Sequence, residues 1–532
     1  MDRAAAEQKT AELVAEYGSP DACPGVLLCD RHPGEAVAFT IVEPDLSYRD
    51  LTFGELGELS SRFAANLAAL GVGPGDAVAT LMGKSAELVV ALLGIWRQGA
   101  VHVPLFTAFA PPAIEFRLAR SGAKVVVADE DQRAKLDPGG GVSGESPWRV
   151  ISGGRLLGDL SLAEIQPAVK GPAAPLVLIF TSGTTGAPKG VPVPVRALAG
   201  ISCYMEYGLD VQPEDVYWNA ADPGWAYGLY YAILGPLATG RRSILLHAGF
   251  SPALTWQVLE RFGVTNFAAA PTIYRAMRAG DGEAAHVRLR RASSAGEPLT
   301  PDIVTWSKVA LGTEVRDHYG QTEHGMIIVN GWHDDVRTDV RPGSMGQPLP
   351  GFSCAVLHDD RDEPTAAGTP GRIAVDMTAS PLAHFTGYHD DPDTAGRFTP
   401  DGRWWLTGDG GYADADENYF FSARDDDVII MAGYRIGPFD VESVLVTHDQ
   451  VIEAAVIGVP DELRGEVIEA FVVLRDPGAG SEELAGELQQ LVKDKFAAHA
   501  YPRRVHFVDA LPKTPSGKVQ RYLLRQQRAE TT

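Results

Sequence analysis

A loop rich in glycine and hydroxyl side chains places the tightest constraint on how this chain can fold. In the segment Leu178-Ile-Phe-Thr-Ser-Gly-Thr-Thr-Gly-Ala-Pro-Lys-Gly-Val191, a short apolar run leads into this loop, which ends at Lys189. Glycines let the backbone bend so that its N–H groups converge on an anion, and the hydroxyls and the lysine add donors and charge. The loop is not a Walker A sequence, because Gly190 rather than Ser or Thr follows the lysine. The sequence therefore predicts an anion site at the end of a buried strand.

Apolar runs typical of strands alternate with helical patterns on both sides of this loop. The strands that we expect span residues 77–81, 101–105, 124–128, 176–180 and 266–270. Such alternation indicates α/β layers with a largely parallel sheet. From about residue 343 the runs become shorter and are punctuated by Gly and Pro, as at 354–357 and 371–377, which indicates a smaller β-rich subdomain.

The acidic run Arg424-Asp-Asp-Asp427 indicates a junction between two domains. We expect residues 1–424 to form a large N-terminal domain and residues 425–532 to form a small α+β domain. Within the small domain the expected strands are 428–431, 451–459, 467–474 and 504–508, and the expected helices are 439–447 and 481–496.

The charge balance and the hydropathy exclude some classes of protein. The chain has 46 basic and 69 acidic residues, a net charge of −23, which argues against a nucleic-acid or anionic-membrane partner. The longest apolar stretch, residues 88–96, is too short to cross a bilayer, and the N-terminus lacks a secretory signal. We therefore expect a cytoplasmic protein with four reduced cysteines. In so acidic a chain, a site for anionic substrates must be locally basic, so individual lysines and arginines are informative.

The glycine-rich loop resembles the signature loop of the adenylate-forming superfamily, which comprises acyl-CoA synthetases, adenylation domains and firefly luciferase. Further family motifs follow in the family's order, and the similarity extends from about Leu51 to Arg525. The resemblance implies an enzyme that uses ATP and Mg²⁺ to convert a carboxylic acid into an acyl-adenylate with release of pyrophosphate. In acyl-CoA synthetases the acyl group then passes to coenzyme A, and a mobile C-terminal lid rotates between the two half-reactions.

The resemblance also implies which residues bind ATP. Ser294-Ala-Gly-Glu-Pro-Leu299 matches the loop along adenine, and Asp317-His-Tyr-Gly-Gln-Thr-Glu323 matches the motif that completes this pocket. Asp409, in Leu406-Thr-Gly-Asp409, and Arg424 match contacts to the ribose. The implied ATP-binding residues are Thr181, Ser182, Gly183, Thr184, Thr185, Gly186, Lys189, Gly296, Glu297, Pro298, Asp317, His318, Tyr319, Gly320, Gln321, Thr322, Asp409, Arg424, Arg435 and Lys518.

Catalysis is implied for four of the matched residues, namely Lys518, Lys189, Thr184 and Glu323. Leu511-Pro-Lys-Thr-Pro-Ser-Gly-Lys518 resembles the family's C-terminal loop, whose lysine reaches the α-phosphate and the attacking carboxylate. Cations are needed there because a carboxylate and a phosphoryl group bring negative charges together. Glu323 is a hard carboxylate suited to Mg²⁺. Asp426 matches the family's hinge between body and lid.

The segment Ala432-Gly-Tyr-Arg-Ile-Gly-Pro-Phe-Asp-Val-Glu442 resembles the medium-chain acyl-CoA synthetase group. The matching coenzyme A positions are Ala432, Gly433, Tyr434, Arg464, Tyr501, Pro502 and Arg503. Arginines suit the phosphates of a nucleotide, but they also commonly form surface salt bridges. Transfer to a carrier protein or to a separate partner enzyme is therefore an alternative to free coenzyme A. The oligomeric state is left open, with a homodimer among the alternatives.

Two positions bear on the size of the acid. Acetate-specific relatives have a tryptophan where this chain has Gly320, so the glycine implies an acid larger than acetate. Trp225 resembles an aromatic residue that lines the acyl pocket, with core packing as the alternative. The segment Val191-Pro-Val-Pro-Val195 departs from the family, because many relatives have a histidine after the phosphate loop. A non-enzymatic scaffold on this fold is the other alternative, but it should have lost Lys189, Glu323, Asp409 or Lys518, and all four are present.

Overall fold

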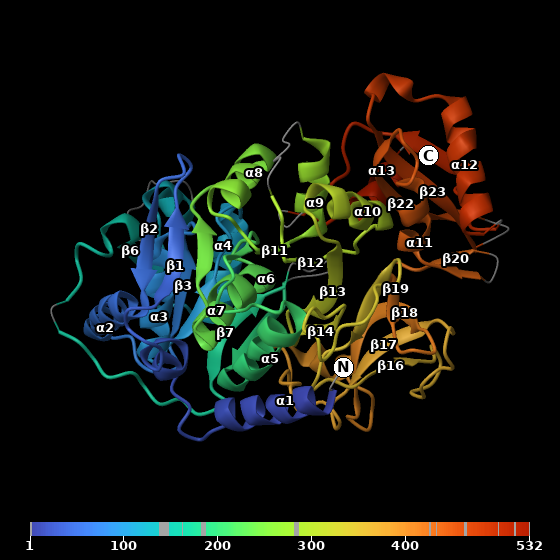
Figure 1. Cartoon of the computed structure of the whole chain (residues 1–532). Helices are drawn as coiled ribbons and strands as arrows, with labels where there is room; N and C mark the ends of the chain where they lie inside the picture. Colours follow the sequence, from blue (N-terminus) through green and yellow to red (C-terminus); the bar gives the residue numbers. More distant parts are fainter. Residues whose placement is uncertain are drawn as a thin grey trace.

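The computed structural model describes residues 3–137, 148–161, 163–181, 188–280, 287–424, 427–431, 434–461, 465–497, 499–514 and 518–530, without the side chains at 392, 393, 434, 435, 465 and 530. Strands group into three sheets, and Figure 1 shows them as a broad α/β body with a smaller C-terminal unit on one side.

A six-stranded sheet lies in the N-terminal part of the body, in the order β6-β5-β3-β4-β7-β8. Its strands are β3 (Ala77–Leu81), β4 (Val101–Pro104), β5 (Val125–Ala128), β6 (Arg149–Ser152), β7 (Pro175–Phe180) and β8 (Gly190–Pro194). All neighbours are parallel except the hairpin β7–β8, which encloses the glycine-rich loop. The accompanying helices are α2 (Phe53–Ala69), α3 (Ala86–Arg97) and α4 (Pro111–Ser121). Helix α3 begins where the Ser85 side chain accepts the Leu88 N–H at 3.2 Å, and it accounts for the apolar run 88–96 as a buried helix.

A 13-stranded sheet runs through the rest of the body. Its parallel part is β1 (Val37–Val42), β10 (Ser243–Leu246), β9 (Tyr217–Asn219), β11 (Asn266–Ala269), β12 (Arg291–Ala295) and β13 (Val315–Gln321), with β2 (Tyr48–Thr52) antiparallel at the edge. The further helices of the body are α1 (Arg3–Tyr17), α5 (Leu198–Cys203), α6 (Ala226–Gly228), α7 (Gly235–Thr239), α8 (Pro252–Arg261), α9 (Pro271–Ala279) and α10 (Pro301–Ala310). The prediction of α/β layers with a mostly parallel arrangement is confirmed.

The β-rich part predicted after residue 343 continues this sheet with antiparallel strands. The antiparallel strands begin before that point with β14 (Gly325–Val329). After residue 343 they are β15 (Ser344–Pro348), β16 (Cys354–Leu357), β17 (Gly371–Asp376), β18 (Trp404–Ala413) and β19 (Tyr419–Arg424). Strand β15 joins the two halves, because it pairs with β14 on one side and β19 on the other. The junction requires glycine at 346, where φ is +96° and a Cβ would lie 2.1 Å from the carbonyl carbon of Val329.

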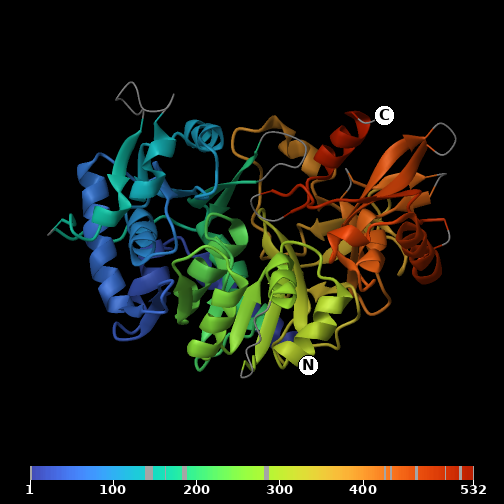
Figure 2. The same cartoon turned by 90° about the horizontal axis from the view of Figure 1, so that it is seen from above.

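The C-terminal unit has its own sheet, which is separate from the body's two sheets in Figures 1 and 2. It contains β20 (Ile429–Met431), β21 (Tyr434–Ile436), β22 (Val451–Asp461), β23 (Gly465–Leu474) and β24 (Arg504–Phe507), with helices α11 (Pro438–Leu445), α12 (Glu482–Lys495) and α13 (Arg521–Glu530). The α+β prediction for this region is confirmed. The boundary placed after residue 424 remains a proposal, since residues 425 and 426 lie outside the described part of the chain.

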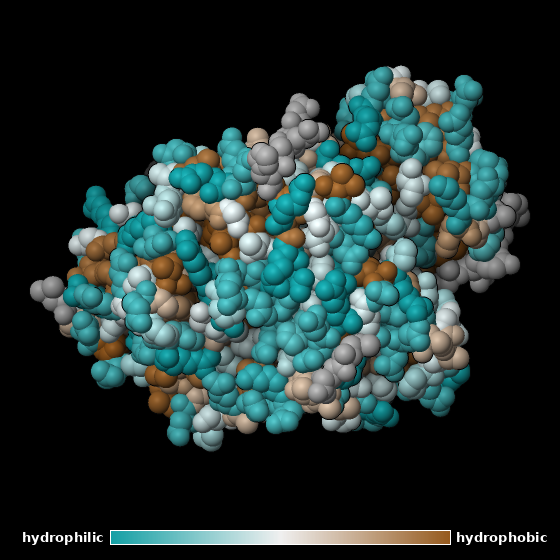
Figure 3. All heavy atoms as spheres, viewed as in Figure 1, coloured by the Kyte–Doolittle hydropathy of each residue, from teal (hydrophilic) through white to brown (hydrophobic). Residues whose placement is uncertain are grey.

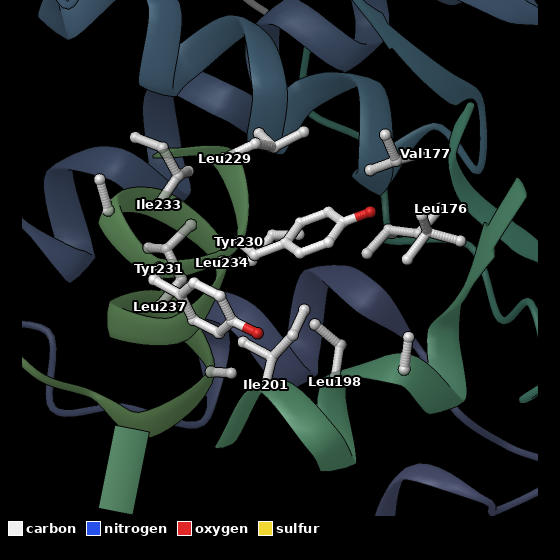
Figure 4. Close-up of a cluster of buried hydrophobic side chains, with 14 of the residues drawn as sticks. Leu176, Val177, Leu198, Ile201, Leu229, Tyr230, Tyr231, Ile233, Leu234 and Leu237 are labelled. Carbon is white, nitrogen blue, oxygen red and sulfur yellow. The ribbon is translucent and has the colours of Figure 1, made fainter. Parts of the chain in front are cut away.

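Buried side chains from both sheets meet in one large core. Figure 4 shows part of it, where Leu176 and Val177 of β7 gather with Leu198 and Ile201 of α5 and with a π-helical segment, Leu229–Leu234. The face shown in Figure 3 is mostly hydrophilic, with apolar side chains in small separate patches. Among the helices of the described residues, none combines the length and apolar character needed to cross a bilayer.

Replacing Gly346 with alanine tests the junction at β15. We expect Gly346→Ala to destabilise the body by about 1–3 kcal/mol, because the new Cβ meets backbone atoms in a left-handed conformation. Gly396→Ala is the matched control, since a Cβ at that position would have no heavy atom within 4 Å and its φ is not positive. Thermal unfolding followed by circular dichroism measures the effect, and equal midpoints for the two variants would contradict this account of the junction.

Candidate active site

A cavity of about 1520 Å³ opens along the carboxyl ends of the strands of both body sheets and extends to the C-terminal unit. This edge is where ligands of open α/β sheets commonly bind. The predicted site residues that line it are Thr181, Lys189, Trp225, Gly296, Glu297, Pro298, Asp317, His318, Tyr319, Gly320, Gln321, Thr322, Glu323, Asp409, Arg424 and Lys518. The fold therefore gathers around one cavity residues that lie more than 300 positions apart in sequence.

The glycine-rich loop is closed at its base by two reciprocal hydrogen bonds. The Thr181 N–H donates to the Lys189 carbonyl at 2.9 Å, and the Lys189 N–H donates to the Thr181 hydroxyl at 3.2 Å. Strands β7 and β8 thus hold both ends of the loop at the cavity. Ser182, Gly183, Thr184, Thr185 and Gly186 lie outside the described residues, so their predicted roles stay predictions.

Tyr388 and Asp391 link the loop lysine to the predicted metal carboxylate. The Tyr388 hydroxyl donates to Glu323 Oε1 at 2.7 Å, and the Lys189 ammonium lies 5.1 Å from the centre of the Tyr388 ring. Lys189 Nζ is also 3.6 Å from an Asp391 carboxylate oxygen. Their segment is fixed to the base of the loop, since the His389 N–H donates to the Gly190 carbonyl at 2.7 Å. Tyr388 and Asp391 were missed from sequence, where only an aromatic and acidic run before Pro392 marks them.

The turn that carries Thr322 and Glu323 is held from below by two buried tyrosines of the segment in Figure 4. The Tyr230 hydroxyl donates to the Thr322 carbonyl at 2.9 Å, and the Tyr231 hydroxyl accepts the Met326 N–H at 2.9 Å. Neither tyrosine belongs to a motif that predicted it as part of the site. These two hydrogen bonds fix the backbone of the turn relative to the core, and so they also fix the position of the Glu323 carboxylate.

Asp317 and His318 differ in what they offer to a ligand. Burial raises the pKa of Asp317 to about 8, and its Oδ1 atom is buried without a hydrogen-bond partner among the described residues. Both ring nitrogens of His318 are engaged, with the Tyr204 hydroxyl at 2.7 Å and the Asn330 carbonyl at 3.2 Å. Burial lowers the pKa of His318 to about 3, so this neutral ring is a structural element. Asp317 retains an acceptor that suits an amino group such as that of adenine.

Asp409 connects two distant strands across the cavity. Its Oδ2 atom accepts hydrogen bonds from the Tyr319 hydroxyl and from Gln321 Nε2, both at 2.6 Å. It lies directly opposite Arg424 in the pairing of β18 with β19. Burial raises the pKa of Asp409, and Arg424 opposes this increase. The strands β13 and β18 are therefore tied together at the predicted ribose position.

Glu297 in the predicted adenine loop is held by helix α9. Thr272 Oγ1 donates to Glu297 Oε1 at 2.7 Å, and an Arg275 guanidinium nitrogen lies 2.6 Å from Oε2. Arg275 and Thr272 also line the cavity, although no sequence motif identified them. This ion pair fixes the loop against the end of β11, which precedes α9.

Lys518 extends from the C-terminal unit into the cavity of the body. Burial lowers the pKa of its ammonium and nearby Arg424 lowers it further, while Glu297, Asp409 and Glu323 act in the opposite direction. The loop is closed locally by the Lys518 N–H, which donates to the Thr514 hydroxyl at 3.1 Å. This arrangement brings the lysine together with the loop lysine and the carboxylates of the body.

Helix α13 follows this loop and anchors it within the C-terminal unit. Arg521 contacts both carboxylate oxygens of Glu442, at 2.8 and 2.9 Å, and an Asp427 oxygen at 3.2 Å. Arg525 lies 2.7 Å from the other Asp427 oxygen. The anchor thus joins the lysine loop to the strand beside the predicted hinge, although the hinge residue Asp426 itself is outside the described residues.

The two residues predicted to shape the acyl pocket have different surroundings. The Trp225 ring lines the cavity and packs against Phe106 and Phe109, with ring centres 5.4 and 5.2 Å away. At Gly320, a Cβ would lie 2.2 Å from the Gly325 carbonyl oxygen. The glycine is therefore required by the close approach of β13 and β14, and a side chain there would displace the hairpin.

The residues predicted to bind coenzyme A are not gathered at the cavity among the described residues. The Tyr501 ring contacts two cations beside the start of β24, with Arg503 3.8 Å and Lys493 4.1 Å from the ring centre. Pro502 is buried next to them. Tyr434 and Arg435 lie in β21, without described side chains, and Ala432, Gly433 and Arg464 are outside the described residues. Their roles remain predictions.

Comparisons with known proteins agree on one family. The model of the AMP-binding enzyme family matches residues 28–388, and that of the AMP-binding enzyme C-terminal domain matches residues 440–518. The chain is 35% identical to acetyl-coenzyme A synthetase of Bacillus subtilis (strain 168) over 520 residues, which cover 93% of this chain and 89% of that protein.

Solved structures extend the similarity to the fold. The crystal structure of Brucella canis acyl-CoA synthetase is 43% identical, with a TM-score of 0.74, and the match covers 98% of this chain and 97% of that one. ATP-bound MatB from Rhodopseudomonas palustris is 27% identical, with a TM-score of 0.84, over 96% of this chain and 99% of that one. The chain therefore belongs to the AMP-binding, adenylate-forming enzymes, within the family of ATP-dependent acyl-CoA synthetases.

Proposed function

We propose that this enzyme converts a carboxylic acid larger than acetate into an acyl-adenylate and then transfers the acyl group to free coenzyme A. The observation that carries the proposal is the meeting of Lys189, Glu323, Asp409 and Lys518 around one cavity. In the first step a carboxylate oxygen of the acid bonds to the α-phosphorus of ATP while the bond to pyrophosphate breaks. In the second step the sulfur of coenzyme A bonds to the acyl carbon and AMP leaves.

Each of these residues has a task in the first step. The base of the glycine-rich loop and Lys189 would hold the β- and γ-phosphates, and Asp409 would accept the ribose hydroxyls. Lys518 would offset the charge that accumulates as the acid's carboxylate approaches the α-phosphate. Glu323 would supply a single protein ligand to Mg²⁺, which usually keeps waters and phosphate oxygens as its other ligands.

The size of the acid is inferred from the open cavity beside Trp225, Phe106 and Phe109. The close packing at Gly320 means that glycine alone is weak support for a larger acid, and the 35% identity to an acetyl-coenzyme A synthetase leaves acetate as the alternative. Pyrophosphate exchange with ATP, measured over acids from acetate to bulky aromatic carboxylates, tests the proposal. A catalytic efficiency that is highest for acetate would contradict it.

Free coenzyme A as the acceptor competes with a carrier protein or a separate partner enzyme. The proposal predicts that loss of the free thiol of coenzyme A keeps pace with AMP formation when purified enzyme, acid and ATP are supplied. Exchange of pyrophosphate without any consumption of the thiol would instead favour the alternative acceptor.

Removing the Lys518 ammonium should slow the two half-reactions to different extents. We expect Lys518→Ala to slow adenylate formation about 10²–10³-fold, because a preorganised cation is lost from the site of charge development. Thioester formation from chemically prepared acyl-adenylate should fall much less. Lys495→Ala, at the exposed end of α12, serves as the control and should leave both rates unchanged. Equal losses in the two half-reactions would refute the assignment.

Removing the Tyr388 hydroxyl should weaken the metal site while leaving the fold intact. Tyr388→Phe deletes the 2.7 Å hydrogen bond that orients Glu323, and partners of metal ligands typically contribute about 10–100-fold to metal affinity. We expect a rise of about this size in the Mg²⁺ concentration that half-saturates ATP binding, measured by calorimetry as well as by pyrophosphate exchange. Tyr48→Phe, on an exposed edge strand, is the matched control. An unchanged Mg²⁺ dependence would show that Tyr388 does not position the carboxylate.

A further inference from the structure

Lys84 brings a positive charge into a part of the cavity that no sequence motif assigned. It lies between β3 and α3, at the same carboxyl edge as the phosphate loop, and it lines the cavity together with Phe106 and Trp225. Its position in this turn is fixed on both sides. The Gly83 N–H donates to Asp129 Oδ2 at 2.7 Å, and the Ser85 hydroxyl caps α3.

The Lys84 ammonium has no hydrogen bond or ion pair with any described residue. The side chain is half-buried in the cavity wall; this burial lowers its pKa, and Asp222 is the charged group that opposes the effect. Glu87 and Asp129 line the same side of the cavity, but neither pairs with it. A lysine that only balanced neighbouring carboxylates would form an ion pair with one of them, so its donors remain available to a molecule in the cavity.

Two further polar groups nearby have unused hydrogen-bonding capacity. The Trp225 indole N–H is buried without a hydrogen bond among the described residues. One oxygen of Asp222 accepts the Gly224 N–H at 2.8 Å, while the other makes no hydrogen bond within the described part. The turn that carries both residues is tight against Phe106, since a Cβ at Gly224 would lie 2.8 Å from the Phe106 Cα. Lys84, Asp222 and Trp225 therefore share one region of the cavity walls.

A purely hydrocarbon acyl chain would leave these groups unsatisfied. A donor that a bound ligand covers and leaves unpaired lowers the binding equilibrium constant by roughly 5- to 150-fold. The aromatic rings of Phe106 and Trp225 provide apolar walls, and Lys84 provides a donor beside them. Such a combination suits a chain or ring that ends in an oxygen acceptor.

We propose that the acid accepted by this enzyme carries an oxygen acceptor, such as a second carboxylate or a carbonyl, at the end opposite its reacting carboxylate, and that Lys84 binds this group. The inference rests on the proposed function, whose acyl pocket includes Trp225, and it names the substrate class of that pocket. The same chemistry is present in coenzyme A, whose amide carbonyls and phosphates are also oxygen acceptors. The test must therefore separate the acid from coenzyme A.

Pyrophosphate exchange in the absence of coenzyme A isolates the acid. We would compare hexanoate, 5-oxohexanoate and adipate, together with shorter and longer matched sets, on the purified full chain. The acids with an oxygen acceptor should exceed the plain alkyl acid in kcat/KM by about 10- to 100-fold at the best chain length, because only they offer the Lys84 ammonium a partner once the bound acid covers it.

Variants of Lys84 should remove this preference selectively. Lys84→Met should lower kcat/KM for the two polar acids only, so that the kcat/KM values of the three acids fall within about threefold of one another. Lys84→Gln keeps a hydrogen-bond donor without the charge, so its kcat/KM should fall less for 5-oxohexanoate than for adipate. Lys308→Met is the matched control, because that side chain is 59% exposed and pairs with Glu314 away from the cavity. Thermal unfolding confirms that each variant is folded.

The outcomes separate this inference from the proposed function. Exchange that is as efficient with plain alkyl acids as with the polar ones overturns the inference and leaves the proposed function intact. An effect of Lys84→Met confined to the KM for coenzyme A, with exchange unchanged, also overturns it and assigns the lysine to the thiol substrate. Absence of exchange with every acid would overturn the proposed function and the inference with it.

Discussion

The Lys518 ammonium enters this cleft from the C-terminal unit and is attracted there by carboxylates of the body. Glu297, Asp409 and Glu323 act to raise the pKa of Lys518, which favours its charged form at this place, whereas Arg424 acts to lower it. Those carboxylates come from three different strands or loops of the body. The placement of the C-terminal unit and the order of the body's strands are therefore coupled through the charge of one lysine. Binding of a polyphosphate would add further negative charge at the same place.

The carboxylates keep their positions because other side chains fix them. Thr272 and Arg275 hold Glu297, Tyr388 holds Glu323, and Tyr319 and Gln321 hold Asp409. None of these contacts lies within a single helix or strand. A change in one of the supporting residues therefore affects the geometry of the charges without removing any charge, and it can change catalysis through position alone.

The region around Trp225 shows why family resemblance alone is a poor guide to the acid. Gly320 was expected to open the acyl pocket, but the backbone of Gly325 approaches it so closely that glycine is needed for the hairpin itself. The polar groups of Lys84, Asp222 and Trp225 are the more direct source of information, since their unused donors and acceptor support our proposal that the acid carries a second polar group. The resemblance implies only an acid larger than acetate, whereas these groups support our proposal of an acid with a second polar end.

The sequence by itself determined the elements and the chemistry-bearing residues, because both depend on local patterns. Alternating apolar runs predicted β3, β5 and β7 almost to the residue, and the glycine-rich loop and the Lys518 loop were identified from adjacent residues. Tertiary structure alone decided that Tyr388 contacts Glu323, that Asp391 lies beside Lys189 and that Lys84 faces the cavity. These contacts join positions that the crossover connections of two sheets bring together, and no local periodicity encodes which strand ends become neighbours.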